Sequence, residues 1–112
     1  MLTSGDVLEA DLGIPSGHEA GFARPVVVVT AQRILDQGPT VVHVVPLTST
    51  LGNYPSEVVI VAEASGLNRD SAAQCQHIRA ISSSRLANNR GNVGAVDLRR
   101  IREMVTLILD AE

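Results

Sequence analysis

The sequence predicts a mainly β fold, in which a small, mostly antiparallel barrel or curled sheet is completed by one C-terminal helix. Short apolar or alternating segments recur along the 112 residues, with glycine or proline at most of the joints between them. A broad apolar stripe at helical spacing occurs near the C-terminus. Hydrophobic residues make up 45% of the chain, which is enough for one core, so we expect a single domain over residues 1–112.

The strands follow from the pattern of each segment. Val7 to Leu12 reads as a strand by alternation, with Gly5 before it and Gly13 after it. The runs 25–30 and 41–48 are almost wholly apolar, which is typical of strands in the interior of a sheet. Shorter strands are expected at 57–62, 71–75 and 77–81.

The remaining segments predict loops, turns and the helix. Residues 13–23 have the polarity and glycine content of a surface loop. A short helical turn is expected after Ser82 to Leu86, and Gly91 to Val93 should turn the chain toward the helix. From Asp97 to Asp110 the apolar side chains form one stripe, so this helix should pack on the sheet.

Composition narrows the function classes. No stretch approaches eighteen consecutive apolar residues, and the N-terminus lacks the pattern of a signal peptide, so we expect an unprocessed cytoplasmic protein without a membrane partner. Cys75 is the single cysteine, and no paired Cys or His motif has metal-ligand spacing. Neither a phosphate-binding glycine loop nor a nucleophile elbow is present. The sequence therefore predicts no metal and no cofactor.

The charge pattern permits an RNA partner but limits how RNA is held. The formal net charge is −3, which argues against non-specific binding to duplex DNA. All nine basic residues are arginine, and seven of them follow position 57, so a local positive groove can form. Phe22 and Tyr54 are the only aromatic residues, too few for a base-stacking platform. RNA contacts should rest on hydrogen bonds, arginine planes and shape.

Two polar groups stand where the apolar strands begin and end. Arg24 opens the run 25–30, and Thr48 with Ser49 closes the run 41–48. A guanidinium can hold two phosphate oxygens in its fork, and a hydroxyl can bind a third, so these residues predict a phosphate site. Structural alternatives stay open, namely an ion pair of Arg24 with Glu9 or Glu19 and a turn cap by Thr48.

The three histidines are candidates for acid and base groups. His43 interrupts an apolar strand and reads as structural. His18 lies in the loop, and His77 precedes Ile78-Arg79; both are candidates for ligand contact.

An ordered set of fragments runs through nearly all of the chain: Gly5-Asp6-Val7, Asp11-Leu12-Gly13, Gly17-His18-Glu19, Arg24-Pro25-Val26-Val27-Val28-Val29, Val45-Pro46-Leu47-Thr48-Ser49, Tyr54-Pro55-Ser56-Glu57-Val58, Gly66-Leu67-Asn68-Arg69-Asp70-Ser71 and Gln76-His77-Ile78-Arg79-Ala80-Ile81. In these fragments the chain resembles the MazF/PemK-like toxins of bacterial type II toxin-antitoxin systems. Any one fragment is a weak signal, whereas the ordered set is specific.

The resemblance implies a plug-like, SH3-type small barrel with a C-terminal helix that forms a homodimer. It implies a sequence-specific, metal-independent endoribonuclease that cleaves single-stranded RNA, an mRNA interferase acting through the RNA 2′-hydroxyl. An antitoxin would restrain it, and operator DNA would be reached only through that antitoxin. By position Arg24 and Thr48 take the catalytic places, and the expected RNA-binding residues are His18, Glu19, Ser49, Gln76 and His77.

Two alternatives differ in class from a nuclease. One is a catalytically degenerate binding module that pairs with an antitoxin and assists operator repression. The other is a toxin similar to CcdB, which would bind a topoisomerase subunit through its C-terminal helix. The chain ends Leu109-Asp110-Ala111-Glu112 without an aromatic residue, so the second alternative ranks low.

Overall fold

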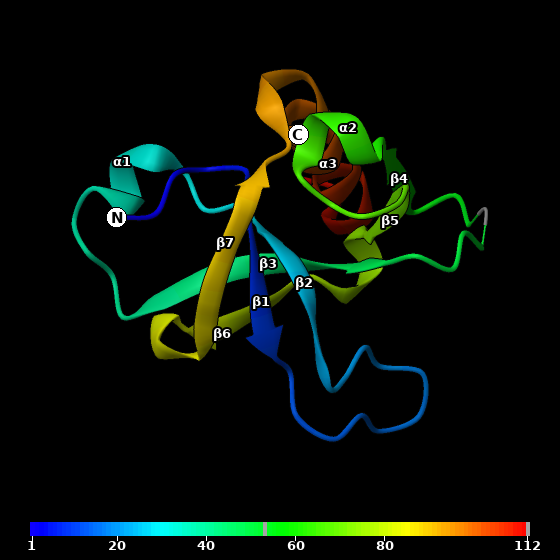
Figure 1. Cartoon of the computed structure of the whole chain (residues 1–112), viewed down its shortest axis with the longest axis horizontal. Helices are drawn as coiled ribbons and strands as arrows, with labels where there is room; N and C mark the ends of the chain where they lie inside the picture. Colours follow the sequence, from blue (N-terminus) through cyan, green and yellow to red (C-terminus); the bar gives the residue numbers. More distant parts are fainter. Residues whose placement is uncertain (53, 112) are drawn as a thin grey trace.

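The computed structural model describes residues 1–52 and 54–111. Within these residues the chain forms seven strands, which are β1 (Asp6–Asp11), β2 (Ala23–Val28), β3 (Val41–Thr48), β4 (Glu57–Ile60), β5 (Ser71–Gln74), β6 (Arg79–Ser82) and β7 (Leu86–Asn92). The helices are α1 (Gln32–Leu35), α2 (Ala62–Ser65) and α3 (Gly94–Leu109), with 3₁₀ turns η1 (Cys75–His77) and η2 (Ser83–Arg85). Figure 1 shows α1 and α2 on opposite sides of β1 and β7.

All strand pairs are antiparallel, in the order β4-β5-β3-β2-β1-β7, and β6 also pairs with β3. The mainly β fold with a C-terminal helix is therefore confirmed. The sheet is not closed into a barrel, however, since this path ends at β4 and at β7.

The sheet branches at β3. Val41 to Val44 pair with β6, whereas Leu47 and Thr48 pair with β5, so β3 changes neighbour along its length. Pro46 lies between these two segments, and its nitrogen has no proton to donate to a ladder. The sheet forks at this point, with β5 and β4 continuing one branch and β6 ending the other.

Alternation along the central strands buries apolar side chains on both faces of the sheet. One cluster contains Val7, Val27, Val45 and Leu47 and packs against α3. The other cluster contains residues that alternate with these, namely Val26 of β2 and Val42 and Val44 of β3, together with Leu35 of α1. This double burial explains why runs 25–30 and 41–48 are continuous apolar sequences.

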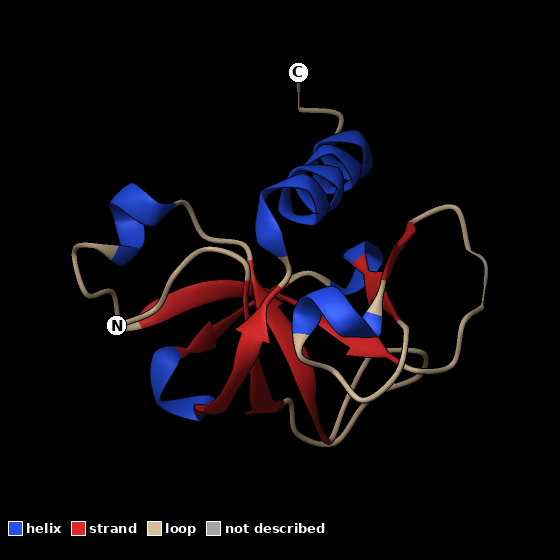
Figure 2. Cartoon of the chain, turned by 45° about the horizontal axis from the view of Figure 1, so that its top comes forward, coloured by secondary structure: helices blue, strands red, loops and turns tan. Residues whose placement is uncertain are grey.

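Helix α3 covers one face of the sheet. Ile101 is fully buried and Leu98 nearly so, and Met104 and Val105 pack against the same cluster. Figure 2 shows this helix as a separate layer above the strands. No helix of the described residues is both long and apolar enough to cross a membrane.

The predicted and observed elements differ most clearly at residues 86–92. A helical turn after Leu86 is wrong, because Leu86–Asn92 forms β7 and pairs with β1 across a bulge between Val7 and Glu9. The turn toward the helix, expected at Gly91 to Val93, falls where β7 ends and just before α3 begins at Gly94. The strand is an edge strand whose side chains are largely exposed, so it has no apolar alternation to reveal it. The sequence does not predict the short helices α1 and α2. The helical turn η2 begins at Ser83, a few residues earlier than expected.

The turn η1 is anchored in the core by Cys75. Its side chain is fully buried, and its Sγ lies 3.7 Å from the Ala73 carbonyl oxygen and 3.9 Å from that of Ile101. Burial raises the pKa of the Cys75 thiol from 9.0 to about 11. The thiol is therefore a packing group that fixes Gln74 and Gln76 on either side of it.

Replacing Ile101 by alanine should destabilise the fold strongly. Removing a fully buried isoleucine leaves a cavity between α3 and the sheet, so the free energy of unfolding should fall by roughly 2–5 kcal/mol. Glu103→Ala in the same helix is the matched control, because Glu103 is exposed and its loss should change stability by less than about 0.5 kcal/mol. Urea denaturation measures both; equal midpoints for the two variants would contradict this packing.

The raised pKa of Cys75 predicts a loss of stability in alkali. Between pH 9 and about 11 the unfolded chain releases the thiol proton while the folded chain keeps it, so the free energy of unfolding should fall as pH rises. Denaturation curves at pH 8 and pH 10 should show this fall in the wild type and a smaller one in Cys75→Ala. The native thiol should also react with iodoacetamide at pH 8 far more slowly than the denatured one.

Candidate functional site

Arg24 is held in a fixed orientation at the start of β2. Its Nε donates to the Gly21 carbonyl oxygen at 3.1 Å, and its Nη1 donates to Oε1 of Gln74 on β5 at 3.2 Å. The side chain is half-buried. Two neutral acceptors therefore aim this guanidinium and leave its positive charge in place.

The carboxylates suggested as partners of Arg24 are engaged elsewhere. Glu9 pairs with Nε of Arg90 at 2.6 Å, and Oε1 of Glu19 accepts from the backbone N–H of Ser16 at 2.9 Å. Among the residues that the structure describes, Arg24 has no acidic partner. The charge of Arg24 is thus available to an anion.

Thr48 lies at the last position of β3 and is half-buried. Its Oγ1 accepts from the Thr50 backbone N–H at 3.2 Å, so the suggested turn cap is present. Because a hydroxyl donates one proton as well as accepting, this bond leaves the Thr48 O–H free to donate. The cap fixes the hydroxyl without consuming its donor.

Strand register relates these groups to one another. Continuing the β2–β3 register two residues beyond the Val26–Pro46 pair places Arg24 opposite Thr48. Side chains directly opposite one another in antiparallel strands share a face. The β3–β5 register, continued one residue beyond Leu47–Ala73, places Gln74 opposite Pro46 and so on that same face. A cation, a hydroxyl and an amide from three adjacent strands are thereby directed to one side of the sheet.

A cavity of about 420 Å³ brings together three of the predicted RNA-binding residues. Its lining consists of Leu12, Ile14, Glu19, Ala20, Gln76, His77, Ile78 and Arg79. Oε1 of Gln76 accepts from the Ser56 hydroxyl at 2.8 Å, which leaves the amide NH₂ free to donate. The carboxylate, amide and imidazole supply donors and acceptors of the kind that read a base edge.

The other two predicted residues are not part of this group. His18 is exposed in the loop between β1 and β2 and lines none of the cavities described here. Ser49 lines a second cavity, of about 240 Å³. The predicted set is therefore divided between two cavities and a loop.

Gln74 and Arg79 were missed by sequence reasoning. Gln74 orients Arg24, and Nη1 of Arg79 donates to the Leu12 carbonyl oxygen at 3.1 Å beside Glu19 and His77. Their positions depend on pairing between strands that are far apart in sequence. A polar residue at the end of an apolar strand was the signal available, as it was for Thr48.

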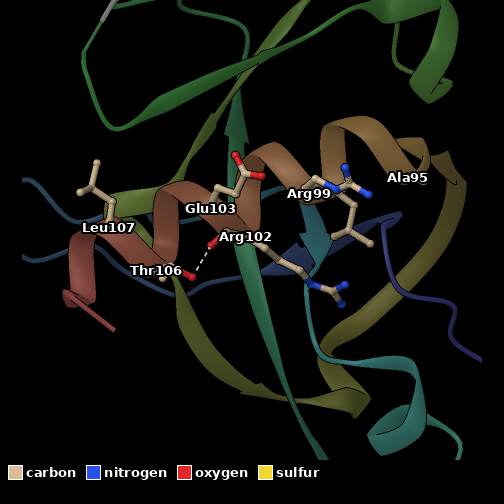
Figure 3. Close-up of a pocket in the computed structure, with 7 residues that line it drawn as sticks. Ala95, Arg99, Arg102, Glu103, Thr106 and Leu107 are labelled. Atoms are coloured by element: carbon tan, nitrogen blue, oxygen red, sulfur yellow. Dashed lines mark hydrogen bonds between the residues drawn. The ribbon is translucent and has the colours of Figure 1, made fainter. Parts of the chain in front are cut away.

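A cavity of about 510 Å³ along α3 contains none of the predicted residues (Figure 3). Figure 3 shows Arg102 extending from the helix. Its Nη2 donates to the Val29 and Thr30 carbonyl oxygens at 2.9 and 3.2 Å. Arg102 therefore ties α3 to the segment after β2, which is a structural role.

We call the side of the sheet that carries Arg24, Thr48 and Gln74 the Arg24 face. The chemistry of these three side chains suits a phosphodiester. The described residues contain no group of three or more His, Cys, Asp or Glu side chains arranged to hold a metal ion. A guanidinium, a hydroxyl and an amide can bind non-bridging phosphate oxygens and stabilise the charge that grows on them in a transition state.

Comparison with known proteins gives a consistent picture. Residues 3–109 match the family described as PemK-like, MazF-like toxin of type II toxin-antitoxin system. The chain is 37% identical over 118 aligned residues to a Mycobacterium tuberculosis protein named Endoribonuclease MazF9, with 98% of each covered.

Solved structures share the fold. MazF from Deinococcus radiodurans superposes with a TM-score of 0.81 at 23% identity, over 96% of this chain and 94% of that one. An endoribonuclease from a mycobacterial species, solved in complex with its cognate antitoxin, gives a TM-score of 0.78 at 19% identity, over 100% of this chain and 98% of that one. At these identities the two structures bear on the fold alone.

Proposed function

This chain belongs to the PemK-like, MazF-like toxin family of type II toxin-antitoxin systems, and on that premise we propose that it is a sequence-specific endoribonuclease that cleaves single-stranded RNA without a metal ion. The observation that carries the proposal is Arg24, a guanidinium that Gln74 aims and that no described carboxylate neutralises. Continuing the β2–β3 register two residues past the Val26–Pro46 pair places it opposite Thr48.

The proposed reaction uses the RNA's own 2′-hydroxyl. Its oxygen attacks the neighbouring phosphorus, the new O2′–P bond forms, and the P–O5′ bond breaks. The products are a 2′,3′-cyclic phosphate and a 5′-hydroxyl end, with the 2′-hydroxyl proton lost and a proton gained by the leaving oxygen. Negative charge builds up on the non-bridging oxygens, where the fork of Arg24 and the hydroxyl of Thr48 stabilise it. Arginine stays protonated, so Arg24 acts through its charge.

RNA sequence would be read beside this centre. Glu19, Gln76 and His77 line one cavity, and their donors and acceptors suit the edges of an unstacked base. His77 is the residue we assign the largest share of specificity, because its ring both hydrogen-bonds and stacks. Ser49 and His18 would contact the strand on either side.

The proposed partners follow from the family. A cognate antitoxin would bind this chain, as in the solved mycobacterial complex, and operator DNA would be reached through that antitoxin. A homodimer is proposed because α3 exposes Val96, Leu107 and Leu109, which are 75%, 70% and 63% accessible in the single chain. Cleavage of cellular RNA would take place in the cytoplasm.

The catalytically degenerate binding module is the less favoured alternative. The relative named as an endoribonuclease covers nearly the whole chain at 37% identity. Arg24 and Thr48 are also both present, each with its position fixed by hydrogen bonds. These observations favour the enzyme.

Arg24→Ala and Thr48→Ala should each lower cleavage of single-stranded RNA in EDTA about 100- to 1000-fold, because each removes one preorganised donor to the phosphate. Rates are measured on a mixed-sequence RNA, with product ends tested for the cyclic phosphate. Thr48→Ser keeps the hydroxyl and the turn cap, so it should retain most of the activity.

The control for these variants is Arg99→Ala, an exposed arginine on α3 outside the Arg24 face. It should cleave at the wild-type rate. The proposed mechanism would be ruled out if the wild type made no discrete cuts. It would also be ruled out if Arg24→Ala cut RNA as fast as the wild type.

His77→Ala and Gln76→Ala should change which sequences are cut more than they change the rate at the scissile bond. Each lost hydrogen bond to a base removes roughly 1–3 kcal/mol of discrimination against a wrong base, by analogy with base readout in DNA. Sequencing the cleavage ends of a random RNA pool measures the preference. An unchanged motif in both variants would show that the base is read elsewhere.

A further inference from the structure

The cavity that contains Ser49 is lined by chain neighbours of both proposed catalytic residues but by neither of the two themselves. Its lining consists of Glu9, Pro25, Leu47, Ser49, Leu67, Asn68, Arg69, Ser71 and Arg90. Pro25 follows Arg24 in the chain, and Leu47 and Ser49 flank Thr48. Alternation turns Pro25 and Leu47 to the sheet face opposite Arg24, so the cavity begins where β3 ends and the chain passes from one face to the other.

Two glycines bring the walls of this cavity together. Gly66 has a φ of +77°, and a Cβ there would collide with the Arg90 carbonyl oxygen. A Cβ on Gly91 would lie 2.7 Å from the Ser65 carbonyl oxygen. The backbone after α2 and the backbone of β7 are therefore in close contact, and this contact places Arg69 and Arg90 around one cavity although they come from different elements.

Structural roles account for most of the segment Gly66-Leu67-Asn68-Arg69-Asp70-Ser71. Gly66 makes the close approach, and Leu67 packs on the core. Asp70 accepts from the Ala62 backbone N–H at 2.9 Å, and the buried Ser71 hydroxyl donates to the Arg69 carbonyl oxygen at 3.2 Å.

Asn68 and Arg69 have no such role. Both are exposed, and neither side chain makes a hydrogen bond with another side chain that the structure describes. Each nevertheless lines the cavity. The loop that begins with the close backbone approach at Gly66 thus presents an amide and a guanidinium that make no hydrogen bond within the described part of the fold.

Arg90 has donors to spare on the opposite wall. Its Nε is bound to Glu9 at 2.6 Å, which fixes the direction of the guanidinium. The five N–H donors of arginine include four on the terminal nitrogens, and these match the oxygens of a phosphate in a fork. With Glu9 neutralising one of the two arginines, the cavity keeps one net positive charge.

We propose that this cavity binds another phosphodiester of the same RNA strand, beyond the end of β3 from the phosphate that is cleaved. The proposal rests on the proposed function and extends it to a second phosphate contact, made by Arg69 and Arg90 with Asn68 and Ser49 as neutral donors. An RNA strand that continues from Thr48 past the end of β3 would meet Ser49 first. This order favours RNA over an acidic peptide as the occupant of the cavity. The contact is to the backbone and is independent of base identity.

The test is Arg69→Gln, with Arg33→Gln as the matched control. Both arginines are exposed, and Arg33 belongs to α1, outside the cavity lining. Binding of a mixed-sequence 2′-O-methyl RNA, which blocks attack by the 2′-oxygen, is followed by fluorescence anisotropy from 50 to 300 mM salt. Losing one phosphate contact should reduce the slope of log K against log salt by about 0.7, and Arg69→Lys should restore the slope.

Cleavage kinetics give the second measurement. Arg69→Gln should raise KM roughly tenfold at low salt, equally for all sequences, with the effect mainly on KM rather than kcat. The difference in KM between Arg69→Gln and the wild type should shrink as nucleotides are removed from the end of the RNA that would lie in the cavity. Equal thermal unfolding of the two glutamine variants shows that folding is intact.

The outcomes separate the two proposals. If the wild type cleaves RNA and Arg69→Gln matches Arg33→Gln in slope and KM, the second phosphate contact is overturned while the nuclease stands. A loss confined to certain sequences would also overturn it, because a base would then be read. If the wild type cleaves no RNA but Arg69→Gln still lowers the salt slope, the proposed nuclease fails and the anion site stands.

Discussion

The rest of the structure depends on the pairing of β3. This strand joins β2 along one edge and divides its other edge between β6 and β5, so it holds both branches of the sheet together. Its middle is buried on both faces, with Val44 in one apolar cluster and Val45 in the other. A shift of one residue would move the exposed His43 into a buried position, so burial disfavours other registers. That register in turn sets Thr48 across from Arg24.

The proposed site contains the positive charge of Arg24, which the described residues orient without placing a carboxylate beside it. A half-buried cation is normally paired with a carboxylate, since losing water costs it free energy. Arg24 is held instead by a backbone carbonyl and by Gln74, while Glu9 is occupied by Arg90. Neutral acceptors keep the guanidinium oriented and still attractive to phosphate. A carboxylate in place of Gln74 would satisfy the fold better and weaken the site.

The placement of the arginines reconciles the acidic chain with the anionic partner that we propose. The net charge of −3 is an average over the molecule, whereas a phosphate responds to the charges within about one Debye length, roughly 8–10 Å. Arg24 and Arg79 are associated with one face of the sheet, and Arg69 and Arg90 with the cavity beyond the end of β3. Cys75, between Gln74 and Gln76 in the chain, packs in the core, and burial raises the pKa of its thiol and keeps it neutral.

The sequence by itself determined the elements whose burial leaves a local pattern. The apolar runs gave β2 and β3, the stripe after Asp97 gave most of α3, and Arg24 and Thr48 stood out because polar groups end those runs. Only the tertiary structure decided β7, since an exposed edge strand carries no alternation. It alone also decided that the sheet forks near Pro46 and that its ends stay open. It also decided that Gln74 holds Arg24 and that Arg69 lies by Arg90. These contacts join residues up to fifty positions apart, and strand register and backbone approach at glycine bring them together, which a local pattern does not encode.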